Sequence, residues 1–260
     1  MASSSTVLAA PSSPVVANAA PPPATTTEGE MDARLLAAAC SGSFQDLESL
    51  LDGQPASSIG SPMQPASPPG DDVEAFLRES LPYAVTVRGD TLLHVVAATH
   101  GHRGDFLKKA SLIHSKAQNL LFVQNDRGDT PLHYAARAGN FQMVSLLIDL
   151  AKDINSEKAL LETENKFKGT ALHEAVRSGN NDLVKLLMTQ DPELACFPRE
   201  GTSPLYLAIL LENKIIAETL YKLSGGVLSY SGPNGQSALH VAVQRSQGSD
   251  FYILISPTIF

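Results

Sequence analysis

Histidine is the residue type in this sequence best suited to bind a metal or to transfer protons, and the chain has seven of them. His100 and His102 form a His-x-His pair, and with His114 they could supply three zinc ligands. Gly101 and Gly104, however, predict a flexible loop around the pair, and no cysteine or glutamate lies nearby to complete the ligand set. The sequence therefore predicts no metal site at these histidines.

The two cysteines are candidate nucleophiles, but neither has a base near it in the sequence. Cys196 follows an expected helix, where a small apolar side chain fills space, and Cys40 lies on an expected helix. Nucleophilic catalysis requires a base that is itself held by a third group. The chain also lacks a phosphate-binding glycine loop with a lysine, a Gly-x-Gly-x-x-Gly motif and a paired-carboxylate motif. We therefore expect no enzyme activity and no cofactor.

Charge and composition restrict the partners. The formal net charge is −8 and the pI about 5.3, so the chain offers no overall positive field to nucleic acid or to anionic lipid. Two cysteines far apart in the sequence indicate a reducing, cytoplasmic compartment. The longest uncharged apolar stretch, 251–260, is about half of what a bilayer span needs and contains Pro257. We expect protein partners and no membrane span in this chain.

The other four histidines belong to a short sequence motif, Thr/Ser-x-Leu-His, that occurs five times. The fourth copy has tyrosine in place of histidine, and the first and fourth positions of the copies are Thr91 and His94, Thr130 and His133, Thr170 and His173, Ser203 and Tyr206, and Ser237 and His240. Repetition at intervals of roughly 33 to 40 residues predicts similar structural units along the chain.

Each copy carries the signals of a helix start. In the second copy, Gly128 suits a tight turn with positive φ, Thr130 suits the N-cap, and Pro131 falls at the first helical position. An alanine-rich apolar turn follows, and after a Gly-Asn pair a second helix is expected from the apolar runs at 143–147 and 183–187. A unit of turn, helix, turn and helix cannot bury its own apolar face, so the units must stack into an all-α solenoid.

At residues 126–136 the sequence resembles the ankyrin repeat, whose signature includes Thr-Pro-Leu-His-x-Ala-Ala. The resemblance is strong over 86–246 and weak over 31–51. It implies that Thr91 with His94, Thr130 with His133, Thr170 with His173, Ser203, and Ser237 with His240 lock their turns, because the imidazole bonds the preceding hydroxyl and the loop backbone. Lys168 replaces one turn glycine. Extra residues in two units predict longer loops around 113–123 and 151–161.

Composition divides the rest of the chain. Residues 1–27 and 53–70 carry no charge and are rich in Pro, Ser and Ala, which favours disorder, although an organellar targeting role for the first stretch is an alternative. We expect a disordered arm at 1–30, a divergent first unit at 31–52, a Pro/Ser-rich linker at 53–85, the array at 86–246 and an apolar tail at 247–260. The units of the array are expected near 86–124, 126–160, 166–197, 199–231 and 232–246. The tail breaks the pattern of the last unit, so we expect an incomplete array that ends prematurely.

An ankyrin-like array implies a concave face made by the turn tips and by the outward sides of the first helices. Alignment of the units places on it, from the turn tips, Arg127, Asp129, Phe167, Glu200, Asn234 and Gln236, and from the first helices, Tyr134, Arg137, Glu174, Arg177, Leu207, Leu210 and Gln244. Aromatic and leucine side chains rimmed by arginine have the composition of a protein-binding patch. The alternatives are a solvated charged surface and local packing under the long loops.

The extended units, and the helix expected to begin at Met31-Asp32, also resemble the plant accelerated-cell-death type of ankyrin protein. In that family a cytosolic array precedes a hydrophobic domain of several membrane spans, and the proteins are implicated in defence and stress signalling. The resemblance implies a non-catalytic interaction scaffold. The alternative is a truncated form of a membrane-associated signalling protein, with association to the plasma membrane implied by the family alone.

Overall fold

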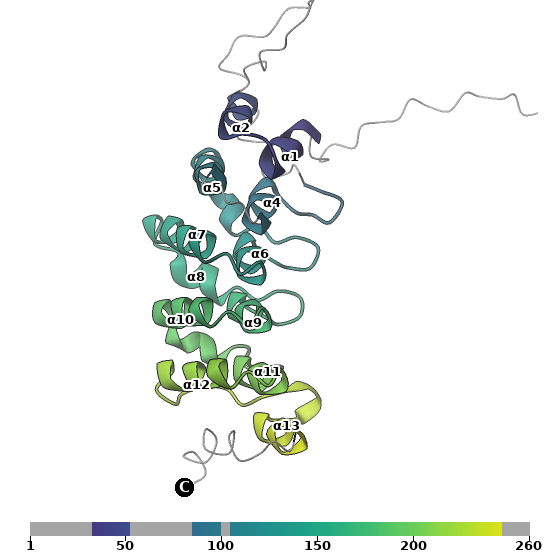
Figure 1. Ribbon diagram of the computed structural model, residues 1–260, viewed down its shortest axis with the longest axis vertical. Coiled ribbons are helices and arrows are strands. Elements are labelled where there is room, and N and C mark those ends of the chain that lie inside the picture. The colour runs from purple at the N-terminus through teal and green to yellow at the C-terminus, as the bar shows by residue number, and fades with distance from the viewer. Residues whose placement is uncertain (1–32, 53–84, 100–104, 246–260) are drawn as a thin grey trace, which may run out of the picture.

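The structure is a computed structural model that describes residues 33–52, 85–99 and 105–245. The expected arm at 1–30, the linker up to residue 84, the His100 and His102 loop and the apolar tail lie outside the described residues. The described part is a single column of helices with no strand, in which consecutive units follow one another from α1 at one end to α13 at the other (Figure 1). The all-α solenoid expected from the sequence is confirmed.

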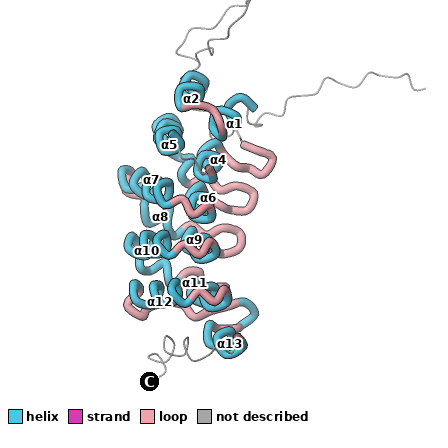
Figure 2. The backbone as a smooth tube through the Cα atoms, viewed as in Figure 1, coloured by secondary structure: helices cyan, strands magenta, loops and turns pink. Residues whose placement is uncertain are grey.

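Two parallel rows of helices build the column. The row of first helices consists of α1 (Ala33–Cys40), α4 (Leu92–Ala98), α6 (Pro131–Arg137), α9 (Ala171–Arg177), α11 (Pro204–Leu210) and α13 (Ala238–Gln244). The row of second helices consists of α2 (Phe44–Leu51), α5 (Asp105–Lys116), α7 (Phe141–Asp153), α10 (Asn181–Gln190) and α12 (Lys214–Leu223). Each helix packs on its neighbour in the same row, including α1 on α4 and α2 on α5. The loops that join the units project beside the first helices (Figure 2).

Local signals set where the helices begin. Thr130, in extended conformation, is the N-cap of α6, and Pro131 follows at the first helical position, where its missing N–H costs nothing. The second helices α7, α10 and α12 begin after an asparagine whose side-chain oxygen accepts a hydrogen bond of 3.1 Å from a backbone N–H three residues on. Lys168 takes the turn position that glycine holds elsewhere, with a φ of 60°.

The extra residues of two units form helical structure, so the expectation of longer loops around 113–123 and 151–161 is wrong. Helix α5 continues to Lys116 and is followed by the 3₁₀ turn η1 (Gln118–Leu121), while α7 continues to Asp153 and is followed by α8 (Glu157–Glu162). Leucine pairs in η1 and α8 are fully buried in the core. Their apolar area draws these segments under the stack, which polar loops would not do. Two further 3₁₀ turns are η2 (Pro192–Cys196) and η3 (Pro233–Gly235).

The core runs along the column between the two rows. The inward-facing side chains of the second helices, among them Leu147, Val184 and Leu220, are completely buried, and most alanines of the first helices from α4 to α13 are buried as well. Small alanine side chains, such as Ala135 and Ala136 in α6, let neighbouring first helices approach closely. Each unit is therefore stabilised mainly by the next one, as a stack of nearest-neighbour interfaces requires.

Candidate functional site

The motif histidines join each unit to the next. Nδ1 of His133 accepts a hydrogen bond of 3.2 Å from the backbone N–H of Thr130, and this leaves Nε2–H to donate to the carbonyl of Gly169 in the following loop at 3.0 Å. His94 and His173 repeat both contacts, with Nε2 at 2.8 Å from the carbonyl oxygen of Asp129 and 3.0 Å from that of Thr202. Burial lowers the pKa of each of these imidazoles, and for His173 to about 4.

The other turn positions behave similarly. Ser237 and His240 make the same contact within their turn at an exposed end of the array, with the hydroxyl 2.7 Å from Nδ1. Ser203 caps α11 by accepting from the backbone N–H of Tyr206 at 3.2 Å, and the Tyr206 hydroxyl donates to Gln236 at 2.7 Å. Both ring nitrogens are therefore hydrogen-bonded in His94, His133 and His173, whereas the contacts found for the exposed His240 among the described residues are on Nδ1.

Asparagines in the loops form a second link, which the sequence analysis missed. The side-chain oxygen of Asn165 accepts from the backbone N–H groups of Phe167 and Gly169, and its NH₂ group donates to Asp129 at 2.8 Å. Asn125 holds its own loop in the same way and donates to Asp90 at 2.6 Å. The signal was present in the sequence, because each asparagine lies five residues before a capping threonine and each aspartate directly before one.

Four charged side chains meet beside the α6 and α9 helices. The guanidinium of Arg137 donates to Asp129 at 2.8 Å and to Glu174 at 2.9 Å, and Arg177 donates to Glu174 at 2.6 Å. Burial alone would raise the pKa of Asp129, but hydrogen bonds from Arg137 and Asn165 hold it below its usual range. Burial opposes the charge of Arg137, yet Glu174 and Asp129 together raise its pKa. This charged cluster joins one turn and two first helices.

Tyr134 lies next to the cluster on α6. Its hydroxyl donates to Asp90 at 2.7 Å, and burial together with this hydrogen bond raises its pKa to about 12. Its ring meets His94 edge-on at 5.4 Å, and the guanidinium of Arg137 lies 5.4 Å from the ring centroid. Tyr134 is therefore half-buried and held by contacts on several sides.

A surface cavity of about 510 Å³ opens over this cluster. It is lined by Arg127, Arg137, Phe167, Glu174, Arg177 and Ser178. The Phe167 side chain is 64% exposed, and the guanidinium of Arg127 lies 5.3 Å from its ring centroid. The lining of the cavity therefore combines an exposed aromatic ring with the partly exposed side chains of Arg127 and Arg177.

Three residues expected on the accessible face are buried, and this corrects the alignment. The side chain of Asp129 is completely covered, because Arg137 and Asn165 close over it. Glu174 is 4% exposed, held between Arg137 and Arg177. Leu207 is 6% exposed, because its side of α11 packs into the core. These three support the array from inside and offer little surface to a partner.

The remaining expected residues reach the surface in two separate places. Arg127, Phe167 and Arg177 gather at the cavity, with Tyr134 and Arg137 half-buried beside it. Leu210 is partly buried against the core. Exposed side chains farther along the array, which do not line the cavity, are Glu200, Asn234, Gln236 and Gln244. The structure therefore divides the expected surface between the middle and the C-terminal end of the described array.

The other candidates for chemistry lie apart from one another. His114 is buried on α5, where its Nδ1 has no hydrogen-bond partner, and burial lowers its pKa. Cys40 is exposed at the end of α1, while Cys196 at the end of η2 lies with its sulfur 3.5 Å from the carbonyl oxygen of Val227. Burial raises the pKa of the Cys196 thiol, which disfavours the nucleophilic thiolate.

Comparisons with known proteins agree with this architecture. Residues 35–158 and 156–227 match the family model described as ankyrin repeats (3 copies). Rabankyrin-5 of mouse is 31% identical over 131 residues, and the human protein 32% over 131 residues, in each case 50% of this chain and 10% of the relative. The chain thus spans about a tenth of the length of these relatives. The crystal structure of the ankyrin repeat domain of Bcl-3, a member of the IkappaB family, superposes with a TM-score of 0.65 at 19% identity and covers 87% of this chain and 86% of that one.

Proposed function

Because this chain belongs to the ankyrin-repeat family, we propose that it is a non-catalytic scaffold that binds a protein partner on the side of its loops and first helices. The observation that carries the proposal is the cavity over the charged cluster, with an exposed aromatic ring and arginine side chains on a fold that serves typically as an interaction module. Aromatic and arginine side chains dominate the binding energy of protein interfaces.

The charges at the cavity favour a particular partner chemistry. Arg127, Arg137 and Arg177 bring three positive charges against the two negative charges of Asp129 and Glu174; both carboxylates are covered, whereas the side chains of Arg127 and Arg177 are 57% and 41% exposed. The cavity is therefore a positive patch on a chain of net charge −8. We propose that the partner presents an acidic segment with an apolar side chain, which would lie on Phe167.

The test is affinity capture of partners by the full chain, followed by measurement of the affinity of the retained protein. Phe167→Ala should weaken binding by about tenfold or more, the usual effect of truncating an aromatic anchor. Phe141→Ala is the matched control, because Phe141 is also exposed, at 44%, but lies at the start of α7 in the row of second helices. Rising salt should weaken binding to the wild type and affect binding to Arg127→Ala less. Equal losses for the two phenylalanine variants would refute the assignment of the surface.

Arg137 is unsuited to this test, because it holds two buried carboxylates and its removal would lower the stability of the array. Glu200, Asn234, Gln236 and Gln244 are proposed as a more distant extension of the interface. The unit at 31–52 is proposed to belong to the same array, since α1 packs on α4 and α2 on α5.

A role in plant defence or stress signalling is a further proposal, and it rests on the resemblance of the extended units to the accelerated-cell-death type of ankyrin protein. The alternative of a membrane-associated signalling protein has the same basis, whereas the proposed cytoplasmic location rests on the two widely separated cysteines. Across the part of the chain that the structure describes, no helix has the length and apolar character that a bilayer crossing requires. Fractionation of cells that express the full chain would test both locations.

A further inference from the structure

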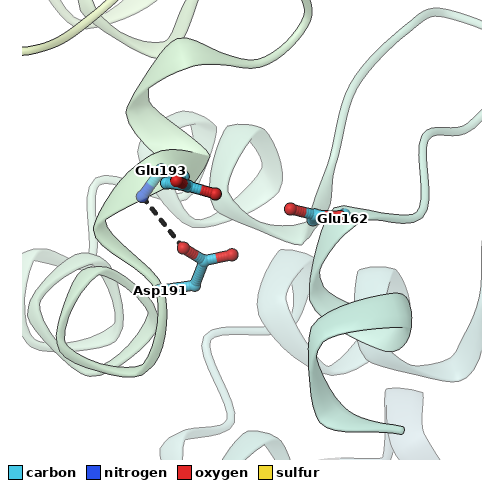
Figure 3. Close-up of side chains that lie close together, drawn as sticks. All are labelled: Glu162, Asp191 and Glu193. Carbon is cyan, nitrogen blue, oxygen red and sulfur yellow. Dashed lines mark hydrogen bonds between the residues drawn. The ribbon is translucent and has the colours of Figure 1, made fainter.

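Three carboxylates from two neighbouring units converge where α8 ends and η2 begins (Figure 3). Glu162 is the last residue of α8, Asp191 is the N-cap of η2, and Glu193 lies on the first turn of η2. One oxygen of each carboxylate lies within 4.8 Å of the other two. In Figure 3 the three side chains point toward one common space. This carboxylate cluster lies outside the proposed protein-binding cavity.

Asp191 is the member of the cluster that points to a ligand. Its Oδ1 accepts a hydrogen bond of 2.9 Å from the backbone N–H of Glu193, which accounts for one oxygen. Its Oδ2 is buried and has no hydrogen-bond partner among the described residues, and in Figure 3 the oxygen not bonded to Glu193 points toward Glu162. The residue is only 8% exposed. A buried carboxylate oxygen without a partner is costly, so this oxygen needs a hydrogen-bond donor or a cation that the described residues do not supply.

Lys158 does not meet this requirement. Its ammonium lies 2.8 Å from Glu193 and 3.6 Å from Glu162, and within the described part of the chain it forms no ion pair with Asp191. Three carboxylates thus face one ammonium, which leaves two negative charges uncompensated. Two positive charges in the same space would balance them.

We propose that Glu162, Asp191 and Glu193 bind a divalent cation, Ca²⁺ in preference to Mg²⁺. Carboxylate oxygens are the ligands of hard cations, whereas zinc prefers nitrogen and sulfur. Ca²⁺ lies about 2.3 to 2.6 Å from its ligands, so oxygens up to about 5 Å apart can bind one ion. Mg²⁺ at about 2.0 to 2.1 Å requires separations of at most about 4.2 Å and a strict octahedron. Separations within 4.8 Å therefore fit the larger Ca²⁺ better than Mg²⁺, with small movements of the side chains toward the ion.

The bound ion would join two units of the array. Glu162 belongs to the unit of α6 and α7, while Asp191 and Glu193 belong to the unit of α9 and α10, so a shared ion fixes one unit against the next. Three protein ligands, with water completing the shell, give an affinity of about 10⁻⁴ to 10⁻³ M. Lys158 lowers that affinity further, because its ammonium competes for two of the three carboxylates.

Calorimetric titration of the full chain with CaCl₂, together with its thermal midpoint, tests the site. We expect one Ca²⁺ site that raises the midpoint, with Mg²⁺ at least about tenfold weaker. Asp191→Asn should abolish both effects, since an amide keeps the cap on Glu193 but removes the charge. Asp182→Asn is the matched control, because Asp182 is an exposed carboxylate on α10 that pairs only with Lys185 among the described residues. Glu162→Gln provides an independent loss of the site if Asp191→Asn does not fold.

Lys158→Met removes the competing ammonium and should strengthen Ca²⁺ binding by about tenfold or more. Three results would overturn the proposal. The first is no Ca²⁺ binding by the wild type, even if Lys158→Met binds it. The second is equal stabilisation of the wild type and Asp191→Asn, since this would reflect general screening of an acidic chain. The third is equal affinity for Ca²⁺ and Mg²⁺.

Discussion

Replacement of Arg137 by alanine is expected to destabilise the array far more than replacement of its neighbour Arg177. Arg137 bridges Asp129 and Glu174, whose side chains are 0% and 5% exposed, so the variant removes the guanidinium that the two buried carboxylates share, although Glu174 keeps its contact with Arg177. Loss of one partner of a buried ion pair costs about 3 to 5 kcal/mol. The Arg137 side chain is 35% exposed and Asn165 still donates to Asp129, so we reduce the expected loss to about 2 to 3 kcal/mol.

Arg177→Ala provides the control. Arg177 is 41% exposed and pairs only with Glu174 among the described residues, and Glu174 keeps its bond from Arg137. Exposed pairs of this kind contribute about 0 to 1 kcal/mol. Arg137→Lys should lie between the two variants, because a single ammonium cannot bond both carboxylates with the geometry of a guanidinium.

Urea-induced unfolding of the full chain, followed by circular dichroism at pH 7, measures these differences. The midpoint of Arg137→Ala should fall clearly below that of Arg177→Ala, while helical content before the transition stays the same. Equal midpoints for the two alanine variants would refute the reasoning. They would show that water reaches Asp129 and Glu174 and that the charged cluster does not determine stability.

Three further perturbations follow from other contacts. Gly128→Ala should lower the free energy of unfolding, measured in urea, by about 1 kcal/mol more than Gly235→Ala does. Both glycines have a φ of 74°, but of the two only Gly128 would place an added Cβ 2.7 Å from a backbone atom, so equal losses would contradict this reasoning. The pKa of His173 is about 4 in the folded chain and ordinary in the unfolded chain, so its contribution to the free energy of unfolding is complete above about pH 6.5, and about 3 kcal/mol of stability is lost as the pH falls toward 4. NMR titration of the His173 ring should give the low pKa, and an ordinary pKa would contradict this. Lys109→Met should speed amide exchange in α1 and α2 by about tenfold and leave α9 unchanged, because Lys109 donates to two carbonyls at the end of α1 and to that of Gly42 in the turn before α2. Unchanged exchange in α1 and α2 would show that the contact is dispensable.

Much of the fold could be predicted because its signals are local. A capping threonine, a proline at the first helical position and a histidine three residues after the cap act within one turn, and in α6 all three occur together. The five copies of the Thr/Ser-x-Leu-His motif therefore predicted the starts of α4, α6, α9, α11 and α13. Reliance on the repeated motif led to one error, since the added residues of two units lack that motif and were expected to be loops, although Ser156 is the N-cap of α8.

The candidate site was predictable only in part. Alignment of the units placed Arg127, Phe167 and Arg177 on one face, and in the structure these three side chains line one cavity, because equivalent positions in stacked units are neighbours. It could not show which side chains their neighbours would cover. Asp129 looks like a turn-tip residue in the sequence, yet Arg137 and Asn165 close over it in the structure.

The sequence by itself determined the repeated unit, the positions of its caps and the solenoid class, because each depends on residues a few positions apart. Only the tertiary structure decided the contacts between units. Lys109 reaches carbonyls about 70 residues away in the chain, and the carboxylate cluster joins α8 to η2. Such contacts depend on how far each unit is rotated and shifted against the next. That geometry is set by the packing of many side chains at once, so no short pattern in the sequence contains it.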